Sequence, residues 1–106
     1  MAFYTYIVAS DRNGTLYIGS TDNLAQRAWE HAEKLRPGFT AKYGVDKLVW
    51  YEAHSSREAA FTRERQIKEW KRAWKIEMIE RANPGWRDLF EDWFPNGEAA
   101  WPFDPN

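Results

Sequence analysis

Arg27 and His31 stand one helical turn apart in this chain of 106 residues, beside apolar positions that recur every three or four residues. These apolar positions, which predict one face of a helix, are Leu24, Ala28, Ala32 and Leu35. On the flank of such a face, an arginine and a histidine can both point at one anionic group. The commoner alternative is a solvent-facing pair with no shared role.

Glu64 falls in the middle of the apolar stripe of a second predicted helix. The apolar positions of that stripe are Ala60, Phe61, Ile67 and Trp74. A carboxylate there loses hydration, which is unfavourable unless it is paired or binds a metal. Mg²⁺ suits the second role because it prefers oxygen ligands and is often held by only one or two carboxylates plus substrate phosphates. The structural alternative is an ion pair of Glu64 with Arg27 or with Lys68.

Basic side chains surround Glu64 in the sequence. Residues 57–75 hold seven Lys or Arg against three Glu. Projected on a helix, Arg65 and Arg72 fall near the same azimuth with Lys68 between them. Such a face can bind phosphates, and it can equally be an ordinary solvated face. The candidate nucleic-acid-binding residues are Arg63, Arg65, Lys68 and Arg72.

Tyrosines stand on two predicted strands. Tyr4 and Tyr6 share one face of the first strand because strand side chains alternate, and Tyr17 lies on the second strand. A buried tyrosine hydroxyl usually finds a polar partner. Packing of the sheet is the usual explanation for tyrosine in a strand.

The elements that must position these residues follow from periodicity and turn chemistry. Asn13-Gly14 predicts a hairpin between the first two strands, since both residues tolerate positive φ. Ser55 and Glu58 form a Ser-x-x-Glu capping box before the second helix. We expect strands at 3–9, 15–19 and 47–53, and helices at about 24–35, 57–72, 73–82 and 88–93. The order β-β-α-β-α-α predicts the α+β class, with a small three-stranded antiparallel sheet flanked by helices.

Composition limits the class of protein. The length suits one domain, and the absence of cysteine excludes disulfides and thiolate metal sites. No apolar run is long enough to cross a bilayer, and the first residues lack the basic region of a signal peptide, so we expect a cytoplasmic protein. The net charge of −1 conceals an asymmetry. Residues 1–75 hold 13 Lys or Arg and 9 Asp or Glu. Residues 76–106 hold 2 Lys or Arg and 7 Asp or Glu.

The acidic end is also aromatic. We divide the chain into a domain over residues 1–85 and a tail over residues 86–106, which contains six large aromatic side chains. Burial of such side chains is favourable, so we expect the tail to pack on the domain. In an alternative arrangement, its acidic residues lie near the basic face and compete with phosphate.

An ordered set of these residues resembles the GIY-YIG endonuclease superfamily. Tyr4-Thr5-Tyr6 stands where the first triplet of the family ends in tyrosine, and Tyr17-Ile18-Gly19 is the second triplet intact. Arg27 and His31 follow on one helix, and Glu64 lies on a later one. Two further segments are similar to the small single-domain YhbQ-like branch: Trp29-Glu30-His31 and Ile67-Lys68-Glu69-Trp70.

The resemblance implies the same three-stranded fold and metal-dependent hydrolysis of phosphodiester bonds in nucleic acid, DNA more than RNA. By position, Glu64 would hold one Mg²⁺ or Mn²⁺, and Arg27 would bind the scissile phosphate. Tyr6 and Tyr17 would position or deprotonate the attacking water. His31 would support that proton transfer or contact phosphate.

Two further positions bear on the function. Asn83 is the best counterpart of a late asparagine of the family and would support the site. Ser20 stands where some repair nucleases of the family carry lysine, and family nucleases with tight specificity carry a second DNA-binding domain that we do not find here. We therefore expect structure-led recognition, with a partner protein supplying specificity. The alternative is a nucleic-acid-binding or accessory module on this scaffold without significant turnover.

Overall fold

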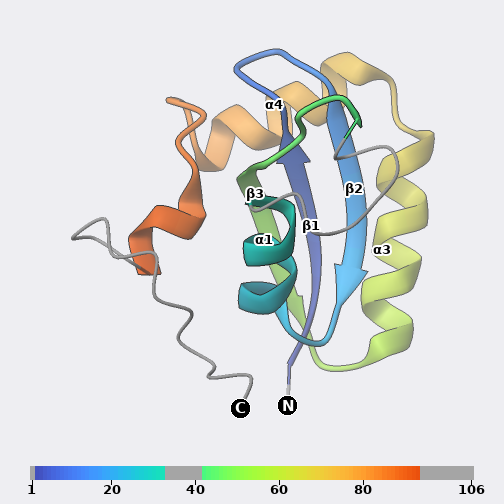
Figure 1. Cartoon of the computed structure of the whole chain (residues 1–106). Coiled ribbons are helices and arrows are strands. Elements are labelled where there is room, and N and C mark those ends of the chain that lie inside the picture. The colour runs from blue at the N-terminus through green and yellow to red at the C-terminus, as the bar shows by residue number, and fades with distance from the viewer. Residues whose placement is uncertain (1, 33–41, 94–106) are drawn as a thin grey trace.

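The computed structural model describes residues 2–32 and 42–93. Within these ranges the elements follow the order expected from the sequence, and the α+β class is confirmed (Figure 1). They are β1 (Phe3–Ala9), β2 (Leu16–Thr21), α1 (Leu24–Ala32), β3 (Lys47–His54), α3 (Arg57–Glu69), α4 (Arg72–Ala82) and the 3-10 helix η1 (Leu89–Trp93). In this part of the chain, no helix combines the length and apolar character that a membrane crossing needs.

β1 is the central strand of a sheet with the order β2-β1-β3, and it pairs antiparallel with both neighbours. The register places Tyr6 opposite Gly19 of β2 and opposite Tyr51 of β3. Because side chains alternate along a strand, β1 directs Tyr6 to one face of the sheet and Ile7 to the other. The predicted three-stranded antiparallel sheet is therefore confirmed.

Different helices cover the two faces of the sheet. In Figure 1, α1 lies in front of the sheet, whereas α3 and α4 lie beside and behind it. Ile7 belongs to an apolar core with α3 and α4, whose buried members are Ile7, Ala9, Ile18, Val49, Trp50, Ile67, Ile79 and Trp86. On the opposite face Tyr6 and Val8 pack with Leu24 and Ala28 of α1.

The buried face of α3 is narrower than the predicted stripe. Its buried residues are Ala60, Glu64 and Ile67. The expectation that Phe61 joins them is wrong, because Phe61 is 51% exposed. Phe61 follows Ala60 by about 100° around the helix axis, which turns its ring toward solvent.

The predicted continuation of α3 is also wrong. The helix ends at Glu69 rather than at 72, and Trp70 has an extended backbone (φ −67°, ψ 151°). α4 then begins at Arg72 in a new direction. The helical phase assumed for Trp74 therefore does not carry over, and Trp74 is 54% exposed instead of buried.

Polar side chains begin α1 and α3. Asn23 Oδ1 accepts a hydrogen bond from the Gln26 backbone N–H (3.2 Å), and Ser56 Oγ accepts one from the Ala59 backbone N–H (3.1 Å). The residue that caps α3 is thus Ser56, one position after the predicted Ser55. The predicted end of the first helix lies outside the described residues.

The described part of the tail packs on the sheet. Trp86 is buried in the apolar core, and Leu89 and Phe90 pack on the opposite face. The Asp88 carboxylate accepts hydrogen bonds from the backbone N–H groups of Leu48 (3.2 Å) and Phe90 (3.0 Å), which anchors η1 to β3. Residues 94–106 of the predicted tail lie outside the described residues.

Candidate active site

Tyr6 is buried at the centre of the sheet, and its ring lies over Gly19 of β2. A Cβ atom on Gly19 would lie 2.6 Å from the Tyr6 Oη and 2.7 Å from its Cζ, which is too close for either atom to remain in place. Glycine at this position therefore makes room for the Tyr6 side chain. Sequence reasoning missed this role, because the signal is the hairpin register that places the two residues opposite each other.

Three rings meet at this point of the sheet. Tyr6 Oη and His31 Nε2 lie 3.2 Å apart, within hydrogen-bond distance. The ring centroids are 6.5 Å apart for Tyr6 and Tyr17, 5.8 Å for Tyr6 and His31, and 5.7 Å for Tyr17 and His31. β1, β2 and α1 thus each contribute one ring to a single cluster, which we call the ring cluster.

The ring cluster changes the proton affinity of Tyr6. Burial raises the pKa of the Tyr6 phenol above its usual value of 10.0, and the neighbouring Tyr17 and Glu64 raise that pKa further. The Arg27 guanidinium acts in the opposite direction without overcoming burial. Tyr6 is therefore a neutral phenol at neutral pH. The charges of Arg27 and Glu64 thus both act on the Tyr6 hydroxyl.

His31 is neutral for the same physical reason. Burial, together with the smaller effect of the positive charge of Arg27, lowers the pKa of the His31 imidazole from 6.5 to about 4. A neutral imidazole has one nitrogen that accepts and one that donates. His31 Nε2 can therefore be the acceptor of this hydrogen bond, with the Tyr6 hydroxyl as its donor.

Arg27 lies one turn before His31 on α1, as the predicted helix requires. Its Nη1 is 3.6 Å from Glu30 Oε1, and both side chains are partly exposed. The ion pair is long and lies near solvent, so it holds the guanidinium only weakly. Arg27 therefore carries positive charge at the edge of the ring cluster while remaining able to bind another anion.

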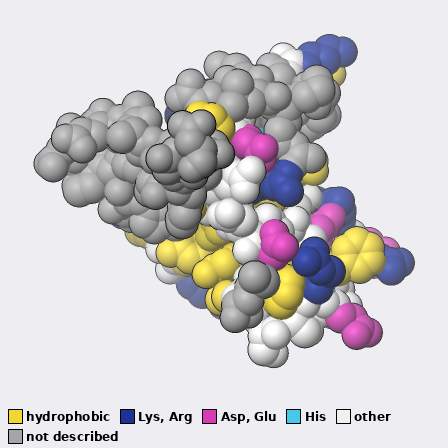
Figure 2. Space-filling model, turned by 60° about the horizontal axis from the view of Figure 1, so that its bottom comes forward, with side chains coloured by type: hydrophobic (Ala, Val, Ile, Leu, Met, Phe, Trp, Pro, Cys, Tyr) yellow, Lys and Arg dark blue, Asp and Glu magenta, His cyan; other side chains and the backbone are white. Residues whose placement is uncertain are grey.

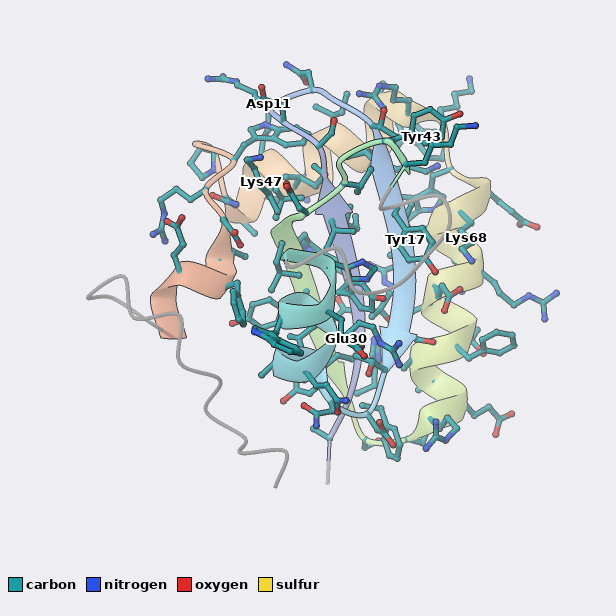
Figure 3. All side chains as sticks on the ribbon, in the orientation of Figure 1. Asp11, Tyr17, Glu30, Tyr43, Lys47 and Lys68 are labelled. Atoms are coloured by element: carbon teal, nitrogen blue, oxygen red, sulfur yellow. The ribbon has the colours of Figure 1, made fainter. Side chains whose placement is uncertain are left out.

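Glu64 is 8% exposed on the face of α3 that packs against the sheet. Its Oε2 accepts a hydrogen bond from Lys68 Nζ at 2.6 Å, one turn further along the helix. Of the two ion pairs considered for Glu64, the structure contains the pair with Lys68, whereas Arg27 pairs with Glu30. In Figure 3, Tyr17 projects from β2 in the direction of α3, and Lys68 projects from α3 into the same part of the view.

Residues 2–77 match the family described as the GIY-YIG catalytic domain. The chain belongs to the GIY-YIG family. Similar proteins include the UPF0213 protein SH2523 of Staphylococcus haemolyticus, 38% identical over 73% of this chain and 93% of its own length. A UPF0213 protein of Syntrophus aciditrophicus is 39% identical over 76% of this chain and 92% of its own length.

A solved GIY-YIG-like fold is also similar. The solution NMR structure of the UPF0213 protein BH0048 from Bacillus halodurans has a TM-score of 0.52 and 25% identity to this chain, and the match covers 86% of this chain and 96% of that one. GIY-YIG membership confirms the resemblance drawn from the sequence, including the resemblance to a branch of small proteins. It places the chain in a nuclease superfamily.

GIY-YIG membership implies a divalent cation, and the residues around Glu64 suit one. In residues 2–32 and 42–93, no group of three or more His, Asp or Glu side chains forms a complete metal cage. Mg²⁺ does not require such a cage, because one or two carboxylates commonly bind it together with waters and phosphate oxygens. Glu64 offers one buried carboxylate, one oxygen of which accepts a hydrogen bond from Lys68 in this structure.

Asn83 does not join the ring cluster. The amide nitrogen of its buried side chain donates to the backbone carbonyls of Val49 (3.1 Å) and Arg87 (2.9 Å), and its Oδ1 accepts from the Arg87 backbone N–H (3.1 Å). These bonds fasten the end of α4 to β3 and to the following turn. They give Asn83 a structural role, and its predicted support of the site would have to be indirect.

The four predicted nucleic-acid-binding residues are dispersed. Arg63 Nε donates to Glu52 of β3 (3.1 Å), and Arg72 donates to the backbone carbonyls of the hairpin turn, at Asn13 (2.6 Å) and Gly14 (2.5 Å). The Arg65 guanidinium lies over the Phe61 ring. Of the four, Lys68 is the one that contacts Glu64. The single predicted azimuth is lost because α4 does not continue the phase of α3.

Proposed function

We propose that this chain is a divalent-metal-dependent endonuclease that hydrolyses phosphodiester bonds in nucleic acid, DNA in preference to RNA. The observation that carries the proposal is the ring cluster of Tyr6, Tyr17 and His31, on which the charges of Arg27 and Glu64 act. A carboxylate for a cation, a guanidinium for a phosphate and a hydroxyl for a water are the parts that such a hydrolysis requires.

The two tyrosines would have different roles. Tyr6 is buried, lies within hydrogen-bond distance of His31 and has a raised pKa, so it is a poor base and acts by positioning. Tyr17 belongs to the same cluster and is only partly buried, so it keeps some contact with solvent. We assign orientation or deprotonation of the attacking water to Tyr17. His31, neutral at neutral pH, would hold the Tyr6 hydroxyl and keep this part of the cluster uncharged.

Arg27 and Glu64 would supply the charges. The Arg27 guanidinium would leave its long ion pair with Glu30 and bind the scissile phosphate, where fixed positive charge stabilises the transition state. Glu64 would hold Mg²⁺ or Mn²⁺, which lowers the pKa of a bound water and stabilises charge on the leaving oxygen. Lys68 would then turn from Glu64 toward a phosphate oxygen.

Substrate recognition would depend on phosphates. Arg65 and Lys68 are exposed on α3 near Glu64, whereas Arg63 and Arg72 have structural partners. Phosphate contacts fix position, carry no sequence information and weaken with salt. Cleavage would therefore follow the structure of the nucleic acid, and a partner protein would supply further specificity.

Glu64→Gln tests the proposal, because it removes the carboxylate charge and preserves the shape of the side chain. Wild-type protein in Mg²⁺ or Mn²⁺ should cleave at least one of branched, nicked and single-stranded DNA or RNA, and Glu64→Gln should not. Glu69→Gln changes the charge of an exposed residue on the same helix and should cleave like wild type. Cleavage that survives Glu64→Gln unchanged rules out this mechanism.

The Lys68–Glu64 ion pair favours a second candidate function, a nucleic-acid-binding module without significant turnover. At 2.6 Å this ion pair already satisfies one oxygen of the carboxylate. Such a module would bind nucleic acid in the presence of a chelator and yield no product with any metal. Binding that requires a divalent cation, and that Glu64→Gln abolishes, would contradict it.

A further inference from the structure

A stripe of exposed side chains runs along α3 beside Glu64. Its members follow one another at intervals of four, four and three residues, which places them on one side of the helix. They are Arg57, Phe61, Arg65 and Lys68, and all four are exposed. A lone exposed apolar side chain needs no explanation. Phe61 is different because it lies between two arginines and faces a hollow in the surface.

This hollow, which we call the Phe61 pocket, lies where the end of β2 meets the first turns of α3. It has a volume of about 540 Å³ and is lined by Ser20, Arg57, Glu58 and Phe61. Figure 2 looks onto the end of the molecule at which α3 begins, where hydrophobic side chains lie among basic and acidic ones. The pocket therefore offers an aromatic face together with groups that donate and accept hydrogen bonds.

The Phe61 pocket adjoins the candidate active site along α3. The register pairs Ser20 with Thr5 and Tyr17 with Val8, so these two side chains of β2 point to opposite faces of the sheet, and the connection runs along the helix. Phe61 stands three residues before Glu64 on α3, a separation of about 4.5 Å along the helix axis. A nucleotide next to a phosphate bound by Lys68, beside Glu64, can therefore bring its base to the Phe61 ring.

The basic residues on either side of Phe61 are suited to a nucleic-acid backbone. The Arg65 guanidinium carbon lies 5.7 Å from the centre of the Phe61 ring. Arg57 pairs with Asp22 at 3.1 Å, and this ion pair is exposed, so a phosphate can replace the carboxylate. An aromatic platform with flanking cations is the combination that proteins use to bind single strands.

We propose that the Phe61 pocket binds an unpaired nucleobase next to the scissile phosphate, with the base stacked on the Phe61 ring. This inference rests on the proposed action on nucleic acid. The Glu58 carboxylate makes the pocket unfavourable for a phosphate, whereas it can accept a hydrogen bond from a base N–H group. The phosphates of the same strand then lie along Arg57, Arg65 and Lys68.

The experiment uses the full chain and short single-stranded oligonucleotides that contain one 2-aminopurine, in chelator so that no cleavage occurs. Stacking quenches the fluorescence of this base, and anisotropy of a labelled copy gives Kd. The variants are Phe61→Ala, Phe61→Trp and, as a control, Trp74→Ala, which truncates an equally exposed aromatic residue on α4. DNA and RNA versions of the probe identify which sugar the ligand carries.

We expect quenching in wild type, its loss in Phe61→Ala together with an increase in Kd of about tenfold or more, and recovery in Phe61→Trp. Trp74→Ala should leave both values unchanged. Equal Kd and quenching in wild type and Phe61→Ala overturn the pocket even if cleavage is intact. Phe61-dependent quenching without cleavage in any metal supports the pocket and refutes the nuclease instead. Equal quenching by a fully paired duplex contradicts the requirement for an unpaired base.

Discussion

The two faces of β1 are built from neighbouring residues and differ in chemistry. Ile7 and Ala9 point to α3 and α4 and pack in the apolar core. Tyr6, the residue before Ile7, points to α1 and meets two further polar rings. Both faces are tightly buried, with Ile7 at 0% and Tyr6 at 3% exposure.

The difference shows that burial serves two purposes in one small sheet. On the Ile7 face, removal of apolar surface from water stabilises the fold. On the Tyr6 face, the same exclusion of water raises the pKa of the Tyr6 phenol and lowers the pKa of the His31 imidazole, so both groups are uncharged at neutral pH. Substitutions on the first face should alter stability, and substitutions on the second should alter chemistry.

The largest expected effect is that of Arg27→Ala on the Tyr6 face. Loss of one fixed positive group at the transition state should lower kcat by about 10²–10³-fold. The unfolding free energy should change little, because the ion pair with Glu30 is long and partly exposed. Single-turnover cleavage and urea unfolding measure the two quantities. Arg81→Ala, which removes another arginine from a glutamate pair, is the control.

Ile79→Ala, on the Ile7 face, should lower stability and leave the cleavage rate unchanged, the reverse of Arg27→Ala. Ile79 is fully buried between α4 and the sheet, so its truncation leaves a cavity that should lower the unfolding free energy by about 2–5 kcal/mol. Cleavage per folded molecule should be unchanged. A large loss of activity at a temperature where Ile79→Ala remains folded would mean that the two faces are not separable.

Gly19→Ala should lower both the unfolding free energy and the cleavage rate, because it displaces Tyr6. The added methyl group would overlap the Tyr6 hydroxyl, and moving a buried ring costs about 1–3 kcal/mol. Activity should fall as well, since the ring cluster must shift. Gly19→Ala should cost less stability in a Tyr6→Leu background, which lacks both Cζ and Oη, than in wild type, and double-mutant unfolding can measure the difference. Additive losses would show that Gly19 and Tyr6 do not interact.

The pH dependence of stability should reveal the lowered pKa of His31. Its pKa is about 4 in the fold and 6.5 when unperturbed, so the unfolded chain takes up the proton first as the pH falls. Between about pH 7 and about pH 5 the fold should therefore lose about 2 kcal/mol through His31. Urea unfolding of His31→Gln should lack this part of the loss. An identical pH slope in wild type and His31→Gln would contradict the neutral imidazole.

Much of this arrangement is predictable from the sequence. Strand composition, the turn at 13–14 and helical periodicity give the element order, and the ordered set of Tyr6, Tyr17, Arg27, His31 and Glu64 identifies the family. The elements are predictable because each depends on residues a few positions apart, and the family is identifiable because its residues follow one another in a fixed order along the chain.

The remaining features depend on contacts between distant segments. The role of Gly19 requires the hairpin register, and the exposure of Trp74 follows from the extended backbone at Trp70. Arg72 binds the carbonyls of a turn about sixty residues away, so no local pattern separates it from a phosphate-binding arginine. The Glu64–Lys68 pair is local, but whether Arg27 of α1 would replace Lys68 depends on the packing of two helices, and Arg27 pairs with Glu30 instead.

A crystal of this protein soaked in Mn²⁺ tests most directly whether side chains from β1, β2, α1 and α3 form one site. We predict anomalous density bonded to the Glu64 carboxylate at about 2 Å, with Tyr17 and Arg27 facing the same space and Lys68 Nζ displaced from Glu64 Oε2. Saturating Mn²⁺ that leaves the Lys68–Glu64 ion pair intact, with density absent or bound elsewhere, would contradict the proposed site.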